Sequence, residues 1–294
     1  MKRKFKIICG CCFLLLCFSV LAFSAEDAGK VAYDKLKEAD TLQNRELDKA
    51  LDVYLEAAGL YEKAMTADPA NRAYKINFKY CLGARGYLQI GYAQKLLKEN
   101  NLAGAAKYFS GAVTAYDLAL KKLPDDKGFA ANRDYAKHNG AKAVFDDLLA
   151  SGGQAPDLDL IAFDGKRFKL SEMKGNIVLL EFWAAWCPSC RESLAVLQQL
   201  HAQYGGKGLC VVAVAMDKTK SWSRGGSDKK AAALSAAHSF SFLWGDEQAE
   251  RAYGYFDSIP RMFLIDRNGN LTAKVYYEDK GEKAVARLVE TLLK

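Results

Sequence analysis

The chain has 294 residues, of which 50% are hydrophobic and 26% charged, and this composition excludes collagen, a disordered acidic tail and a disulfide-dense miniprotein. The length suggests about two domains. The formal net charge is +7, but four of the 42 basic residues lie in the first six positions, and without them the balance is 38 to 35. This bias is too weak to predict a nucleic-acid partner, so we expect none.

The chain begins with a basic segment, residues 1–6, followed by an apolar stretch over residues 7–23 and then by acidic residues. This order is typical of a secretory signal peptide, and the small side chains of Ala22 and Ser24 predict cleavage after Ser24. We therefore expect an extracytoplasmic mature protein, in the periplasm or cell envelope. The alternative is an uncleaved membrane anchor, although the stretch is shorter than the ~20 residues that span a bilayer comfortably.

Residues 28–149 show helical spacing of their apolar side chains, with breaks at 68–71, 98–101 and 123–126. Small residues alternate with aromatic ones, so the helices can approach closely with the rings between them. We predict an all-α domain over residues 25–150.

Two segments of this region resemble the end of the second helix of a tetratricopeptide repeat, namely Tyr61-x-x-Ala64 before Pro69 and Tyr116-x-x-Ala119 before Pro124. The resemblance is partial, because the signature of the first repeat helix is missing. Such arrays usually offer a concave surface to a partner protein, which is one interpretation of this domain. The other is a plain helical bundle that spaces or dimerises the rest of the chain.

After a short Gly-rich linker, residues 151–156, the pattern changes to short apolar strands. Asn268-Gly269 marks a hairpin. We predict a second domain over residues 151–294, a mixed sheet covered by helices, with strands over 177–183, 209–216, 262–265 and 271–277 and helices over 188–204 and 282–293. The Lys- and Gly-rich stretch 218–230 is interpreted as a solvated loop rather than a binding site.

Four of the eight cysteines lie in the leader, and Cys81 and Cys210 lie in apolar patterns that predict core thiols. Cys187 and Cys190 form Cys-Pro-Ser-Cys at the expected start of a helix. There the unpaired N–H groups and the helix dipole lower the pKa of the Cys187 thiol. Cys190 lies one helical turn later on the same face. Two thiols so placed exchange disulfides: Cys187 attacks a substrate disulfide and Cys190 resolves the mixed disulfide.

Two other interpretations of the pair are weaker. A disulfide across so few residues at a helix start is strained, which makes it a poor choice for stability alone. A zinc site needs about four ligands, but there is no second such pair and the three histidines are scattered. We expect no metal and no other cofactor.

Glu181 is the one carboxylate in the apolar strand that precedes the motif. Burial would raise the pKa of this carboxyl group, so that it could accept the proton of Cys190. The alternative is that Glu181 points to a solvated edge and has no role.

Three segments carry a family resemblance: Gln154-Ala155-Pro156, the run Leu-Glu-Phe-Trp-Ala-Ala-Trp-Cys-Pro-Ser-Cys-Arg over 180–191, and Ile-Pro-Arg-Met-Phe-Leu-Ile-Asp over 259–266. On these segments, residues 155–294 resemble the thioredoxin superfamily, and within it the extracytoplasmic TlpA/ResA-like thiol–disulfide oxidoreductases. The resemblance implies an α/β thioredoxin fold, with Cys187 as nucleophile, Cys190 as resolving thiol and Glu181 as the buried acid. It also implies that Pro260 is a cis proline and that substrate binds along Trp186, Ile259 and Pro260.

Two positions depart from the family pattern. Ser193 stands where many members have an acid three residues after the second cysteine. Arg261 follows Pro260 where threonine is usual, and it would place a positive charge near the disulfide. We predict that Arg261 stabilises the Cys187 thiolate or selects acidic substrates.

The leading functional hypothesis is an exported reductase of protein disulfides, for example in cytochrome c maturation or thiol repair, which would need a membrane electron donor. A second hypothesis is a protein-binding adaptor whose helical domain is the functional part. A third hypothesis is a thiol peroxidase, which requires the motif P-x-x-x-[ST]-x-x-C. With Cys187 as its cysteine, Leu180 stands in place of the proline and Ala184 in place of the Ser or Thr.

Overall fold

The computed structural model describes residues 24–275 and 277–294, so the predicted signal peptide lies outside the described residues except for Ser24. The chain divides into two compact units between Leu82 and Gly83. In the part of the chain that the structure describes, no helix combines the length and apolar character needed to cross a membrane.

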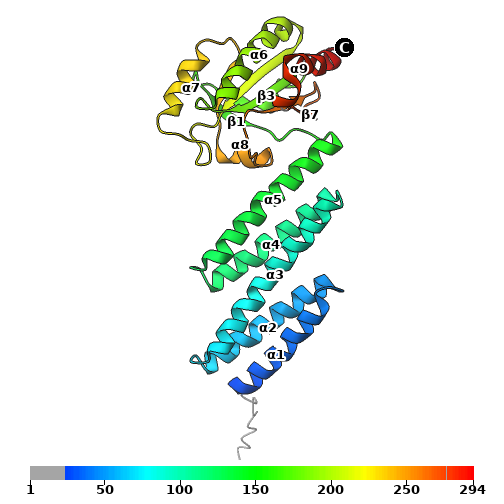
Figure 1. Ribbon diagram of the computed structural model, residues 1–294, viewed down its shortest axis with the longest axis vertical. Helices are drawn as coiled ribbons and strands as arrows, with labels where there is room; N and C mark the ends of the chain where they lie inside the picture. Colours follow the sequence, from blue (N-terminus) through cyan, green and yellow to red (C-terminus); the bar gives the residue numbers. More distant parts are fainter. Residues whose placement is uncertain (1–23, 276) are drawn as a thin grey trace, which may run out of the picture. The chain divides into compact units, whose positions relative to one another are not determined.

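The first unit is built from α1 (Ala25–Leu42), α2 (Leu47–Ala67) and the beginning of α3 (Arg72–Lys98) (Figure 1). Ser24 caps α1, because its hydroxyl accepts the N–H of Asp27. The alanines that face the neighbouring helix are buried, which lets α1 and α2 pack closely. The break between α1 and α2, at residues 43–46, was not predicted, since it contains neither Pro nor Gly.

A repeated tyrosine–asparagine hydrogen bond occurs in both units. Asn77 donates to the hydroxyl of Tyr61 at 3.0 Å, and Asn132 donates to that of Tyr116 at 3.2 Å. Both tyrosines are buried, and a buried phenol needs such a partner. The second pair lies 55 positions after the first, so the helical region contains an internal repeat. This interval is longer than the ~34 residues of a tetratricopeptide repeat, and that likeness stays a prediction.

The second unit continues with the rest of α3, α4 (Leu102–Lys122) and α5 (Lys127–Ser151). All three predicted breaks are confirmed. The side chains of Asn101 and Asp126 cap α4 and α5 by accepting backbone N–H groups. Gly152 ends α5 in the left-handed conformation, with φ 64°.

The remainder of this unit is a seven-stranded sheet in the order β2-β1-β5-β4-β3-β6-β7. Strands β3, β4 and β5 are parallel, whereas β1, β2, β6 and β7 pair antiparallel with their neighbours. The strands are β1 (Asp159–Ala162), β2 (Arg167–Lys169), β3 (Ile177–Trp183), β4 (Leu209–Ala215), β5 (Ser241–Trp244), β6 (Arg261–Ile265) and β7 (Leu271–Val275).

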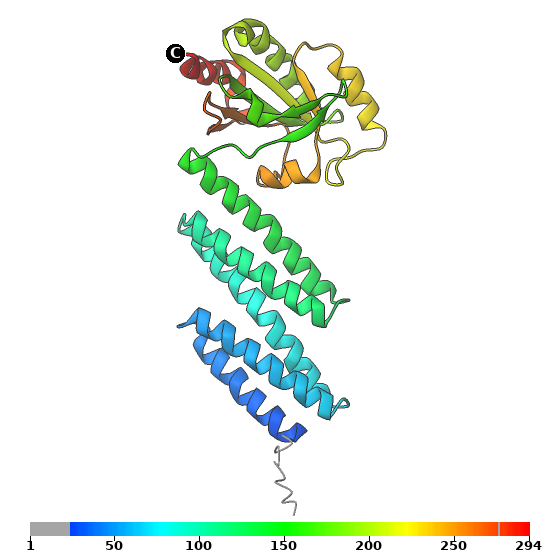
Figure 2. The ribbon, with the colours of Figure 1, turned by 180° about the vertical axis from the view of Figure 1, so that it is seen from behind.

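Helices cover both faces of this sheet (Figures 1 and 2). One core cluster joins Leu179 and Trp183 of β3 to α6, α7 and α9, and the other joins Leu180 and Phe182 to α5 and α8. Strand β3 is therefore buried on both faces, as its continuous apolar run predicts. The helices are α6 (Pro188–Tyr204), α7 (Ser227–Ser235), α8 (Glu247–Ala252) and α9 (Tyr277–Leu293), with 3₁₀ turns η1 (Leu170–Met173) and η2 (Gly205–Lys207).

The mixed sheet with flanking helices confirms the predicted thioredoxin-type α/β fold, and β3 and α6 have the predicted bounds. Strands β1, β2 and β5 and helices α7 and α8 were missed because each is short. The last helix of the helical region also packs on the sheet, because the ring of Phe145 in α5 lies 5.1 Å from that of Phe263 in β6. The division into domains at 150/151 stays a prediction.

Candidate active site

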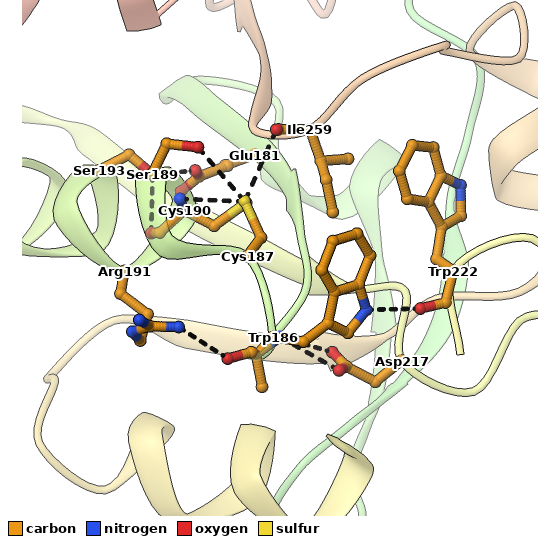
Figure 3. The surroundings of a disulfide bond; sticks show 11 residues. Glu181, Trp186, Cys187, Ser189, Cys190, Arg191, Ser193, Asp217, Trp222 and Ile259 are labelled. Carbon is orange, nitrogen blue, oxygen red and sulfur yellow. Dashed lines mark hydrogen bonds between the residues drawn. A yellow bond between two sulfur atoms is a disulfide. The ribbon is translucent and has the colours of Figure 1, made fainter. Parts of the chain in front are cut away.

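A disulfide joins Cys187 and Cys190 where β3 leads into α6, with the two Cα atoms 5.3 Å apart. Cys187 is the N-cap residue of α6, and Pro188 is the first helical residue, where its missing N–H is no loss. The backbone N–H of Cys190 donates to Sγ of Cys187 at 3.2 Å (Figure 3). When the disulfide is reduced, this N–H and the helix dipole favour a thiolate at Cys187.

Cys187 is the outer residue of the pair, because it keeps 4% exposure whereas Cys190 has none. Its Sγ atom lies 3.4 Å from Oγ of Ser189 and 3.6 Å from the carbonyl oxygen of Ile259. The peptide bond between Ile259 and Pro260 is cis, as the family resemblance implies. Ile259 is half-buried, and its backbone carbonyl lies beside the outer sulfur.

Glu181 is fully buried on the side of β3 that faces α6, so the alternative of a solvated carboxylate is wrong. Burial raises the pKa of Glu181 to about 8, and a hydrogen bond from the Ser193 hydroxyl opposes the rise. The same hydroxyl lies 2.9 Å from the carbonyl oxygen of Cys190 (Figure 3). Within residues 24–275 and 277–294, no hydrogen bond reaches Oε2 of Glu181. A buried acid whose pKa is raised towards the neutral range thus lies under the motif.

Comparisons with known proteins match the half of the chain that carries this site. Residues 151–274 match the AhpC/TSA family. The thioredoxin-like protein YneN of Bacillus subtilis is 31% identical over 41% of this chain and 68% of its own length. The thiol–disulfide oxidoreductase ResA of Bacillus thuringiensis subsp. konkukian is 29% identical over 51% of this chain and 80% of its own length.

This chain belongs to the thioredoxin superfamily. Within it, the chain is a TlpA/ResA-like thiol–disulfide oxidoreductase. Among solved structures, a putative thiol:disulfide interchange protein DsbE from Chlorobium tepidum is similar, with 32% identity, a TM-score of 0.41, and coverage of 49% of this chain and 97% of that protein.

Arg261 does not lie where the family pattern led us to expect it. It is the first residue of β6 and lines a small pocket together with Tyr253 and Phe263, which belong to the core cluster of α5 and α8. Its Nη2 donates to Oγ of Ser258 at 3.2 Å. The disulfide belongs to the cluster on the other face of the sheet. The prediction of a charge on the Cys187 side is wrong, because alternate residues of a strand face opposite sides.

Asp217 is a site residue that the sequence interpretation missed. It follows β4, is 2% exposed, and accepts the backbone N–H of Ala185 with both carboxylate oxygens at 3.1 Å. Burial raises its pKa, and hydrogen bonds from Ser227 and Ala185 oppose the rise. Asp217 thereby fixes the loop between β3 and Cys187. A polar residue directly after a buried parallel strand was the available signal, since β4 ends beside β3.

Trp222 is a second missed residue. Most of the stretch 218–230 is exposed, as predicted for a solvated loop, but Trp222 is half-buried and α7 begins at Ser227. The indole Nε1 of Trp186 donates to the carbonyl oxygen of Trp222 at 2.6 Å, and the two rings stack with their centroids 6.3 Å apart (Figure 3). Trp222 therefore lies beside the residue that precedes Cys187.

The other cysteines and possible metal ligands lie apart from this site. Cys81 is buried, and burial raises the pKa of its thiol to about 12, as suits a core thiol. Cys210 is half-buried, and burial raises its pKa as well. Among the described residues, no three His, Cys, Asp or Glu side chains are grouped to hold a metal ion.

Proposed function

We propose that the protein is exported and reduces disulfides in other proteins through the Cys187–Cys190 pair. The observation that carries this proposal is the asymmetry of the two sulfurs. Cys187 caps α6 beside the Ile259 carbonyl and retains some exposure, whereas Cys190 is closed off beneath it. An outer thiol that a substrate can reach and an inner thiol that only the outer one can reach are what an exchange reaction needs.

The proposed reaction balances without a cofactor. The Cys187 thiolate attacks one sulfur of a substrate disulfide, that bond breaks, and the second substrate sulfur leaves as a thiolate that takes a proton. Cys190 then loses its proton and attacks Cys187, which forms the intramolecular disulfide and releases the first substrate sulfur. The substrate gains two electrons and the protein loses two. A membrane dithiol donor would return them, and this electron donor is part of the proposal.

We propose that Glu181 accepts the proton that Cys190 loses. Ser193 is a positioning residue for the Glu181 carboxyl group. A hydroxyl has one hydrogen, so Ser193 can donate either to ionised Glu181 or to the Cys190 carbonyl, and both acceptors lie within hydrogen-bond reach. When Glu181 has taken a proton, it can itself donate to Ser193, which then turns to the carbonyl. The pKa of about 8 keeps this carboxyl group able to gain and lose a proton near neutral pH.

The helical region is proposed to bind a partner protein. Two exposed side chains one helical turn apart on α3 within the first unit, Ile76 with 64% and Tyr80 with 50% exposure, support a binding role for this part of the helix. Export rests on the leader-like order of residues 1–24, and an extracytoplasmic site of action follows from export.

The direction of exchange is tested by the equilibrium redox potential of the Cys187–Cys190 pair, measured against a glutathione or dithiothreitol series. A reductase is expected near the value of thioredoxin, about −270 mV, and an oxidant near that of DsbA, about −120 mV. A redox potential near that of DsbA rejects the reducing role but still supports an oxidoreductase. A protein that reduces neither insulin nor hydrogen peroxide favours the adaptor hypothesis instead.

A further inference from the structure

The segment between β4 and α7, residues 218–226, is held at both ends by one buried carboxylate. Asp217 accepts a hydrogen bond from the side chain of Ser227 as well as from Ala185. The backbone N–H of Ser227 in turn donates to the carbonyl oxygen of Arg224 at 2.8 Å. The base of this segment is therefore tied to the same group that fixes the loop before Cys187.

The middle of the segment is held by Trp222. Its carbonyl accepts Nε1 of Trp186, and its own Nε1 donates to Oε1 of Glu250 at 2.9 Å. The Trp222 ring also stacks on Phe256, with the ring centroids 5.7 Å apart. Glu250 is buried, so this hydrogen bond is shielded from water. The segment thus has one defined position next to Trp186.

Arg224 is the charged group that this position brings to the motif. Its guanidinium carbon lies 4.6 Å from the centroid of the Trp186 ring, within the range of a cation–π contact. Arg224 is exposed, and Trp186 directly precedes Cys187 in the chain. Arg224 therefore places a positive charge beside Trp186.

We propose that residues 218–226 are a substrate-docking loop in which Arg224 selects protein substrates with a carboxylate near the reacting cysteine. The proposal rests on the exchange reaction proposed above and adds a substrate class to it. A substrate segment that reaches Cys187 passes Trp186, and its flanking side chains then meet the guanidinium. An arginine held over an aromatic ring keeps N–H groups at its edge, and the flat guanidinium matches a carboxylate.

The test compares rate constants for oxidation of the reduced full-length protein by three peptide homodisulfides, in which Glu, Gln or Lys flanks the cysteine. The wild-type protein is expected to react about two- to fivefold faster with the Glu peptide than with the Lys peptide, as an exposed ion pair allows. This ratio should approach one in 0.5 M salt. Arg224→Glu should invert the ratio, and Arg224→Gln should bring it near one.

Lys229→Glu is the matched control, because it makes the same charge change at an exposed position on α7 outside the loop. It should leave the ratio at the wild-type value. The proposal is overturned if Arg224→Glu keeps the wild-type ratio, if it slows the Glu and Lys peptides equally, or if Lys229→Glu shifts the ratio as much. A wild-type protein that reacts with none of the three peptides contradicts the exchange reaction itself, which is a different result from exchange without selectivity.

Discussion

Replacing Cys187 by serine is expected to reduce insulin reduction by more than about a thousandfold, because it removes the attacking sulfur. Replacing Cys190 by serine should abolish turnover to a similar extent but leave the first step intact. In that variant the Cys187 thiolate still attacks, and no second thiol resolves the product. A mixed disulfide between the protein and its substrate should accumulate.

The two variants are compared by insulin turbidity for turnover and by non-reducing electrophoresis for the mixed disulfide. Cys210→Ser is the matched control, because Cys210 is a half-buried free thiol on β4, and it should keep wild-type turnover. Accumulation of a mixed disulfide in the Cys187→Ser variant, but not in Cys190→Ser, would reverse the assigned roles.

Replacing Glu181 by glutamine is expected to change how the stability of the oxidised protein depends on pH. The pKa of Glu181 in the folded protein is about 8, whereas an unfolded chain has about 4.3. The folded state therefore binds more protons between these values. Stability is greatest below the lower pKa and falls as pH rises through the upper one, by up to about 5 kcal/mol at about 1.4 kcal/mol per pKa unit.

The measurement is urea unfolding of the oxidised wild type and of Glu181→Gln at pH 5, 7 and 9. Glutamine keeps a partner for Ser193 but cannot ionise, so the variant should gain stability relative to wild type as pH rises. Glu172→Gln, which changes an exposed carboxylate on η1, should show no such gain. Parallel curves for wild type and Glu181→Gln would mean that the buried acid does not titrate in this range.

The motif and its strand were predictable because their signals are local. The six apolar or aromatic positions that flank Glu181 in β3 indicate a strand buried on both faces, and Pro188 indicates where the helix begins. Cys187 then falls at the N-cap without any tertiary information. The burial of Glu181 follows from the same run.

The positions of Trp222 and Asp217 beside the motif were not predictable, because their contacts join residues far apart in the chain. Trp222 is 36 positions from Trp186, and Asp217 is 32 positions from Ala185. Nothing in a Lys- and Gly-rich stretch indicates that one indole will stack on another. Arg261 was misplaced for a related reason: its position next to Pro260 could be read from the chain, but the face of β6 that it occupies depends on how β6 pairs with β3.

The central claim, that Cys187 is ionised and accessible while Cys190 is shielded, is tested most directly by alkylation of the reduced protein with iodoacetamide from pH 5 to 9. Site-resolved mass spectrometry should find Cys187 modified first. An ordinary thiol has a pKa of about 8.5, so the Cys187 reaction should reach half its maximal rate below that pH. Cys190, Cys81 and Cys210 should remain unmodified in the folded protein. Modification of Cys190 as fast as Cys187, or a Cys187 that reacts only above pH 8.5, would contradict the account.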